Sequence, residues 1–239
     1  MEDFFFLNLG GGEPFIRKDL PEIVEAFYKN NHIQNLLIPT NGTMNNIILV
    51  SIKTILEKCP QLKVSIDVSI DGIGKLHNEI RGGKDTFKKA IRSLNDLLEL
   101  KKTYPNLQVG TITSQMSYNQ KHLEEIYLFL KKEIKPDSIT LALTRGFPRQ
   151  PRAKEIDIKY YQELCQKMED DFLKGQIPGF RKILFDTASL QPMPDAYIFL
   201  IQIFLYLTGQ PWSWSIIEAG FNKSPPIPPG VGPGICTLS

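Results

Sequence analysis

The segment Val64-Ser65-Ile66-Asp67-Val68-Ser69-Ile70-Asp71 alternates without a break between apolar and polar residues. A period of two indicates a β-strand with one apolar and one polar face. In an antiparallel sheet the polar face would only meet solvent. Helical patterns flank this strand on both sides in the sequence, however, and they favour βαβ crossovers and a parallel sheet. In a barrel the apolar face would pack against the helices and the polar face would line the lumen.

Four other short apolar runs are expected to form strands, and each of the five strands is followed by an amphipathic helix. The additional strands are expected at residues 4–9, 36–39, 107–113 and 139–144. Apolar residues three and four positions apart predict helices at 19–29, from the capping residue Thr43 onward, and at 85–102, 120–132 and 158–173. These five βα units predict an α/β fold, a parallel βα-barrel.

The predicted strands end in polar or glycine-rich stretches that recur about every thirty residues. These stretches are Leu9-Gly10-Gly11-Gly12-Glu13-Pro14, Thr40-Asn41-Gly42, Ser69-Ile70-Asp71-Gly72, the polar run from Thr111 to Ser114, and Thr144-Arg145-Gly146. The carboxyl ends of parallel barrel strands meet on one rim, and such barrels build their active sites there. We therefore expect the functional residues on that rim.

The glycines after the first strand, with the carboxylate beside them, suit a ligand that carries an amino group. Consecutive glycines let the backbone approach a ligand closely and expose its N–H groups. Glu13 adds a negative charge next to Gly11 and Gly12, and a cationic amino group is its natural partner. A plain glycine-rich turn is the alternative interpretation, and this motif alone does not separate the two.

Three further residues suit the remaining parts of a nucleoside or amino-acid ligand. Ser69 and Asp71 lie two residues apart on one strand, so they point the same way and suit the hydroxyls of a ribose. The alternative for Asp71 is a hydrogen-bonded turn with Gly72. Arg81 could hold a carboxylate through two hydrogen bonds, although an isolated arginine is more often a surface residue.

Taken together, these motifs resemble the radical SAM superfamily. The resemblance rests on Gly-Gly-Glu-Pro at 11–14, Thr-Asn-Gly at 40–42, and Ser-Ile-Asp-Gly at 69–72 followed by His77 and Ile80-Arg81-Gly82, and it runs over about residues 4–174. The sequence is most similar to the SPASM-type branch, which modifies peptides or builds metabolites. The resemblance implies a partial (β/α)6 TIM-like barrel. It also implies reductive cleavage of S-adenosylmethionine at a [4Fe–4S] cluster, followed by hydrogen abstraction from a substrate.

The family resemblance also implies which residues of this chain contact the cofactor. Gly11, Gly12 and Glu13 would hold the amino group of S-adenosylmethionine, Ser69 and Asp71 the ribose or methionyl part, and Arg81 the carboxylate. The strands that carry Ser114 and Thr144 resemble the adenine-facing strands of the family. The complete predicted cofactor-binding set, with one residue from the second strand end, is Gly11, Gly12, Glu13, Asn41, Ser69, Asp71, Arg81, Ser114 and Thr144.

The cysteines depart from the family pattern. The family holds its cluster with a Cys-x-x-x-Cys-x-x-Cys loop after the first barrel strand. This chain has three cysteines, Cys59, Cys165 and Cys236, without that spacing. We therefore expect no metal ligand, no catalytic residue and no activity from this chain alone. The resemblance implies a fragment that lacks the first βα unit, with the cysteine loop upstream. The alternative is a non-catalytic barrel that binds S-adenosylmethionine or another nucleotide, so whether the chain is an enzyme stays open.

Composition divides the chain into two parts. Residues 1–185 carry the predicted barrel, whereas residues 186–239 carry little charge and are rich in proline, so their fold is not predicted. The apolar stretch at 196–207 is shorter than the roughly 20 residues that a membrane span needs. We therefore expect no membrane partner.

Charge and the amino terminus narrow the partners and the location. Twenty-eight basic and twenty-six acidic residues give a formal charge of +2, which does not favour nucleic acid. The amino terminus lacks the pattern of a secretory signal, so we expect a cytoplasmic protein. The resemblance implies a small-molecule or peptide substrate, and an electron donor in an intact relative.

Overall fold

The computed structural model describes residues 6–144 and 150–183. The chain divides into two compact units, Met1–Leu184 and Phe185–Ser239. The description below concerns the first unit. The predictions for the tail, for Cys236 and for Arg145-Gly146 fall outside the described residues.

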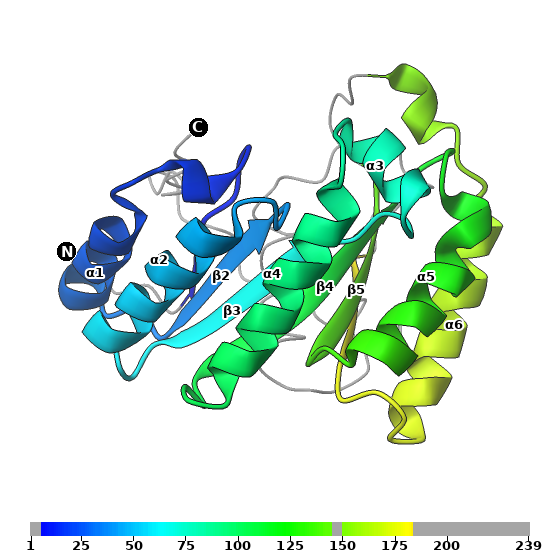
Figure 1. Cartoon of the computed structure of the whole chain (residues 1–239). Coiled ribbons are helices and arrows are strands. Elements are labelled where there is room, and N and C mark those ends of the chain that lie inside the picture. Colours follow the sequence, from blue (N-terminus) through cyan, green and yellow to red (C-terminus); the bar gives the residue numbers. More distant parts are fainter. Residues whose placement is uncertain (1–5, 145–149, 184–239) are drawn as a thin grey trace, which may run out of the picture. The chain divides into compact units, whose positions relative to one another are not determined.

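Six parallel strands form one sheet in the order of the sequence (Figure 1). The strands are β1 (Phe6–Asn8), β2 (Asn35–Thr40), β3 (Lys63–Ser69), β4 (Leu107–Gln115), β5 (Ser138–Leu143) and β6 (Phe180–Ile183). The predicted α/β class, the parallel sheet and the first five strands are confirmed. Strand β6 was not predicted, because its four residues include adjacent Arg181 and Lys182 and form no apolar run.

One helix from each connection between consecutive strands lies on the same face of the sheet (Figure 1). These helices are α1 (Leu20–Asn31), α2 (Asn45–Lys58), α4 (Thr86–Lys101), α5 (Leu123–Phe129) and α6 (Ile158–Leu173). Helix α5 continues directly into the π-helical turn Leu130–Ile134. No helix in the ranges 6–144 and 150–183 is both long enough and apolar enough to cross a membrane.

Both faces of β3 are buried, and this confirms the two-faced pattern read from residues 64–71. The apolar residues Val64, Ile66 and Val68 belong to the hydrophobic core and have no exposed surface. On the opposite face, Asp67 is 4% exposed and Ser69 is 9% exposed. Burial of a polar face is stable only where its groups find partners. The partners of these polar residues therefore describe the lumen side of the sheet.

A short helix that was not predicted carries two residues of the family motif. Helix α3 (Lys75–Arg81) contains His77 and ends at Arg81. It lies between Gly74, with φ of 56°, and Gly82, with φ of 72°. Glycines are frequent in turns, where they adopt positive φ. The glycines on both sides of this segment therefore indicated a turn and not a helix.

One local expectation, for the start of helix α2, was wrong. Thr43 does not cap helix α2, which begins at Asn45 after Met44; the Thr43 backbone N–H and hydroxyl instead donate to Asn41 Oδ1 at 2.8 and 2.6 Å. The polar run from Thr111 to Ser114 lies within the last five residues of β4, which ends at Gln115, so it belongs to the carboxyl end of that strand. Within β4 the side chains alternate, so fully buried Thr111 faces the helices while half-buried Ser114 lies on the opposite face.

Candidate functional site

The carboxylate of Glu13 joins the ends of β1 and β2. Its Oε1 accepts a hydrogen bond from the Thr40 hydroxyl at 2.7 Å, and its Oε2 accepts one from the Asn41 backbone N–H at 2.8 Å. The structure therefore brings two predicted residues, Glu13 and Asn41, together. Glu13 is half-buried, and no basic side chain within residues 6–144 and 150–183 forms an ion pair with it.

The glycines before Glu13 leave open space beside the backbone. A Cβ atom added at residue 10, 11 or 12 would meet no atom within 4 Å, and all three residues are exposed. Gly11 has a φ of +123°, a backbone conformation that residues other than glycine rarely adopt. This strand end is accessible, and its conformation at Gly11 requires glycine.

Asp71 and Arg81 form an ion pair just beyond β3. Arg81 Nη2 lies 2.5 Å from Asp71 Oδ2, although the two groups are not aligned as a hydrogen bond. The Asp71 side chain is fully buried, whereas 31% of the Arg81 side chain is exposed. Asp71 Oδ1 accepts a hydrogen bond from the Ser114 backbone N–H at 2.9 Å. Three predicted residues therefore meet at one point: Asp71 just after β3, Arg81 on α3 and Ser114 on β4.

Two residues that were not in the predicted set hold this point in place. His77 Nδ1 accepts a hydrogen bond from the Asp71 backbone N–H at 3.2 Å. Burial lowers the pKa of His77 to about 4, so the ring is neutral near pH 7 and keeps its acceptor. The fully buried Asn119 donates through Nδ2 to the backbone oxygens of Asp71 and Ser114, both at 2.9 Å. Asn119 was missed because a single asparagine after a strand carries no specific signal.

The other two predicted residues stand at the ends of β3 and β5. Ser69 is the last residue of β3 and is buried. The Thr144 hydroxyl donates to the backbone oxygen of Gln115 at 2.6 Å and so ties the end of β5 to the end of β4. Eight of the nine predicted residues lie at or just beyond the carboxyl ends of β1 to β5, and Arg81 is the last residue of helix α3. The carboxyl ends of the strands are the usual position of functional residues in parallel βα folds.

An ion pair on the polar face of the sheet was also missed. Arg181 Nη2 on β6 lies 2.6 Å from both oxygens of Asp67 on β3 and 3.1 Å from the Ser138 hydroxyl on β5. The pair spans two intervening strands, and Gly110 on β4 is in register between Asp67 and Ser138. A side chain at residue 110 would occupy the space that this ion pair uses. The ion pair therefore lies on the lumen face of the sheet, below the carboxyl ends of the strands.

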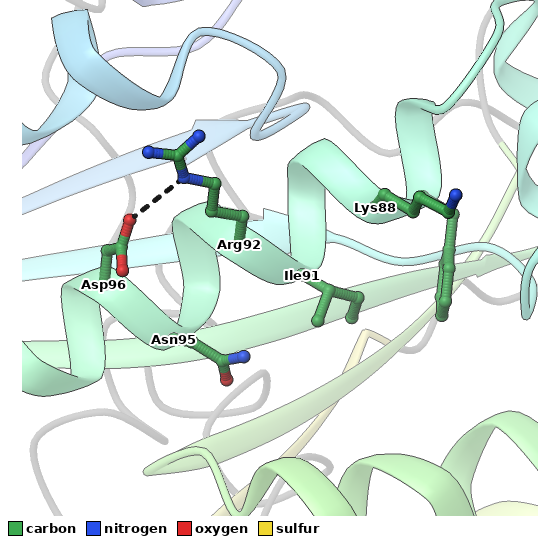
Figure 2. A pocket seen from close by; sticks show the side chains of 6 residues that line it. Lys88, Ile91, Arg92, Asn95 and Asp96 are labelled. Carbon is green, nitrogen blue, oxygen red and sulfur yellow. Dashed lines mark ion pairs between the residues drawn. The ribbon is translucent and has the colours of Figure 1, made fainter.

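A surface hollow of about 380 Å³ lies on the outer side of α4 (Figure 2). Its lining residues all belong to the first three turns of α4: Phe87, Lys88, Ile91, Arg92, Asn95 and Asp96. Arg92 Nε and Asp96 Oδ2 are 3.6 Å apart there, a spacing typical of a solvated helical pair. The hollow contains none of the predicted site residues.

The described cysteines do not form a metal site. Cys59 and Cys165 are both buried, and neither is in a disulfide bond. Burial raises the pKa of the Cys59 thiol, which disfavours the thiolate that iron requires. Across the described parts of the chain, no three His, Cys, Asp or Glu side chains are grouped so that they could hold a metal ion.

Comparison with known proteins identifies the family. Residues 5–130 match the family model described as "Radical SAM superfamily". The chain belongs to the radical SAM superfamily. This superfamily uses S-adenosylmethionine and a [4Fe–4S] cluster, so the resemblance read from the motifs is confirmed.

Similar proteins include enzymes with different substrates. This radical SAM chain is 31% identical over 124 residues to Fe-coproporphyrin III synthase of Methanosarcina barkeri, covering 52% of the chain and 28% of that protein. It is 27% identical over 194 residues to a probable GTP 3′,8-cyclase of Methanococcus vannielii, covering 77% of the chain and 58% of that protein. The chain therefore spans less than two thirds of either relative.

A solved structure supports the fold. SuiB of Streptococcus suis, solved with bound S-adenosylmethionine, is 18% identical and superposes with a TM-score of 0.55, covering 74% of this chain and 39% of SuiB. At that level of identity the likeness concerns the fold alone. It confirms the predicted α/β partial-barrel fold.

The rim residues of this radical SAM chain fit one of the family's two cofactors. Open backbone at residues 10–12, the carboxylate of Glu13 and the partly exposed guanidinium of Arg81 are complementary to the amino and carboxylate groups of S-adenosylmethionine. The described residues do not fit the [4Fe–4S] cluster, because they offer no group of thiolates.

Proposed function

We propose that this chain forms the S-adenosylmethionine-binding part of a radical SAM enzyme. The observation that carries the proposal is a pair of opposite charges at one edge of the sheet. The acceptor Glu13 has no basic partner among the described residues, and Arg81 keeps 31% of its side chain exposed. An amino acid presents an ammonium and a carboxylate side by side. Glu13, with the backbone of Gly11 and Gly12, would bind the ammonium group, and Arg81 would bind the carboxylate.

The nucleoside part of the cofactor would then lie over the ends of β3, β4 and β5. Ser69, Ser114 and Thr144 stand at these ends, and serine and threonine hydroxyls can both donate to and accept from ribose and adenine. Asn41 acts indirectly in this proposal, because its backbone N–H orients Glu13. The role of Asp71 is treated separately below.

We propose that the chain alone does not cleave its cofactor. In the superfamily, the reduced cluster supplies the electron for cleavage of S-adenosylmethionine, and hydrogen abstraction from the substrate follows. The three cysteines of this chain do not have the spacing that such a cluster needs. Anaerobic reconstitution with iron and sulfide should leave well under one iron per chain. About four irons per chain would contradict this part of the proposal.

The comparisons support two classes of substrate. Fe-coproporphyrin III synthase and GTP 3′,8-cyclase are named for small molecules, whereas SuiB has been solved with its precursor peptide SuiA. We propose that the substrate of the whole enzyme is likewise a small molecule or a peptide. An electron donor completes the partners that we propose, with no nucleic acid among them and a cytoplasmic location.

Calorimetric titration of the full chain with S-adenosylmethionine tests the proposed function. We expect saturable binding, and Glu13→Gln should weaken it about tenfold, which corresponds to about 1.4 kcal/mol. Glu133→Gln is the matched control, because it removes an exposed carboxylate from the π-helical turn and should change the affinity less than twofold. Absence of binding by the folded chain would refute the proposal.

A further inference from the structure

We infer that Asp71 positions Arg81 and does not itself contact the cofactor. This inference rests on the proposed function, in which Arg81 binds the carboxylate of S-adenosylmethionine. It departs from the role that the family resemblance implies for Asp71, a contact to the ribose or methionyl part. Burial, hydrogen bonding and the shape of the guanidinium each support it.

Burial separates the two partners of the ion pair. The Asp71 side chain has no exposed surface, while 31% of the Arg81 side chain is exposed. A ligand at the rim can therefore reach Arg81 without moving it, whereas it cannot reach the Asp71 carboxylate. The oxygens of Asp71 are also engaged, since Oδ1 accepts from the Ser114 backbone N–H and Oδ2 lies 2.5 Å from Arg81 Nη2.

The backbone of Asp71 is fixed from two sides. Its N–H donates to His77 Nδ1 at 3.2 Å, and its carbonyl oxygen accepts from Asn119 Nδ2 at 2.9 Å. His77 and Arg81 both belong to helix α3, so the same short helix anchors Asp71 and supplies the arginine. The carboxylate is therefore a fixed point from which the guanidinium takes its position.

Arg81 keeps donors for a ligand. A guanidinium has five N–H donors, and the 2.5 Å contact between Arg81 Nη2 and Asp71 Oδ2 is not aligned as a hydrogen bond. Within residues 6–144 and 150–183, Asp71 is the one charged partner of Arg81. The remaining edge of the guanidinium can still form the paired hydrogen bonds by which arginine recognises a carboxylate. Asp71 thus restricts the rotamers of Arg81 before the cofactor binds, so that binding costs less side-chain entropy.

Two ligands distinguish a positioning role from direct contact. S-adenosylmethionine contains the amino-acid carboxylate, whereas 5′-methylthioadenosine keeps the adenine and ribose but lacks that group. In calorimetric titrations of the full chain, Asp71→Asn should weaken S-adenosylmethionine about tenfold and leave 5′-methylthioadenosine within twofold of the original chain. In the Arg81→Gln background, Asp71→Asn should have no further effect on either ligand, because the group it positions is gone.

The control and the contrary results are equally specific. Asp85→Asn replaces an exposed aspartate before α4 and should change neither affinity. A loss of 5′-methylthioadenosine binding in Asp71→Asn, equal to the loss for S-adenosylmethionine, would overturn the inference and leave the proposed function intact. Additive effects of the two substitutions would overturn it as well.

A measurement without ligand keeps the inference testable if the original chain does not bind S-adenosylmethionine or if Asp71→Asn does not fold. Nuclear magnetic resonance relaxation of the Arg81 side-chain Nε reports whether the guanidinium is ordered. We expect Arg81 to be ordered in the original chain and mobile in Asp71→Asn. An Arg81 side chain as mobile as that of the exposed Arg92 in the original chain would refute the positioning role.

Discussion

Replacing Gly110 with alanine should destabilise the fold by disrupting the ion pair on the polar face of the sheet. A Cβ at residue 110 would overlap Asp67 Oδ1, lie 2.5 Å from the Ser138 hydroxyl oxygen and lie 3.3 Å from Arg181 Nη2. Two of these atoms belong to the ion pair between Asp67 and Arg181, whose side chains are 6% and 20% exposed. Each of the three atoms has a hydrogen-bond partner among the other two side chains or within the ion pair. None of them can move away from the new methyl group without losing that partner.

The magnitude follows from two costs and one smaller offsetting effect. Adding a methyl group to a packed interior costs about 1 to 3 kcal/mol, and removing one partner of a buried ion pair costs about 3 to 5 kcal/mol. The alanine displaces Asp67 without removing its charge, so only part of the second cost applies. Alanine also restricts the unfolded chain, which offsets about 0.4 to 1 kcal/mol. We expect a net loss of about 2 kcal/mol, or about 4 to 8 °C in melting temperature for a domain of this size.

Thermal and urea unfolding followed by circular dichroism measure this effect. Gly10→Ala is the matched control, because a Cβ there meets no atom within 4 Å, and its melting temperature should stay within about 2 °C of the original. Ser138→Ala in the Gly110→Ala background should recover part of the loss, since it removes one of the overlapping atoms. A Gly110→Ala protein with the same melting temperature as the original chain would refute the claim that residue 110 packs against this ion pair.

Three further results are expected. Burial lowers the pKa of His77 from its ordinary 6.5 to about 4, so between these pH values the unfolded chain binds more protons than the folded one, and stability falls as the pH drops from 6.5 to 4. His77→Gln should remove this pH-dependent part of the stability, of the order of 3 kcal/mol, when urea midpoints are measured across pH. A variant whose pH profile of stability equals that of the original chain would contradict this expectation. Tyr127→Phe removes a 2.5 Å hydrogen bond to Asp171 and should lower the unfolding free energy by about 1 kcal/mol in urea, whereas no loss would show that the bond contributes nothing net. Asn119→Asp loses the amide donor to two backbone oxygens and should weaken S-adenosylmethionine binding in calorimetry, in contrast to Asn95→Asp on the outer side of α4.

Much of the fold was predictable because its signals are local. The period of two in residues 64–71 requires only that one strand have two different faces, and β3 has them. The positions of Glu13 and Asp71 followed from topology, since the carboxyl ends of parallel strands meet at one edge. Their neighbours across that edge, Asn41 and Ser114, are likewise at or beyond strand ends.

The missed features depend on information that no local pattern contains. Asp67 and Arg181 are 114 residues apart, and their pairing depends on the register of four strands. Strand β6 offered no apolar run, so the position of Arg181 could not be inferred. The ion pair between Asp71 and Arg81 depends on helix α3, whose flanking glycines indicated a turn.

Decarboxylated S-adenosylmethionine offers the most direct test of the central claim, that the rim binds the amino-acid end of the cofactor between Glu13 and Arg81. This compound keeps the amino group and the nucleoside but lacks the carboxylate. In calorimetric titrations of the full chain it should bind about tenfold more weakly than S-adenosylmethionine, and Arg81→Gln should abolish that difference. Equal affinities for the two compounds in the original chain would contradict the claim.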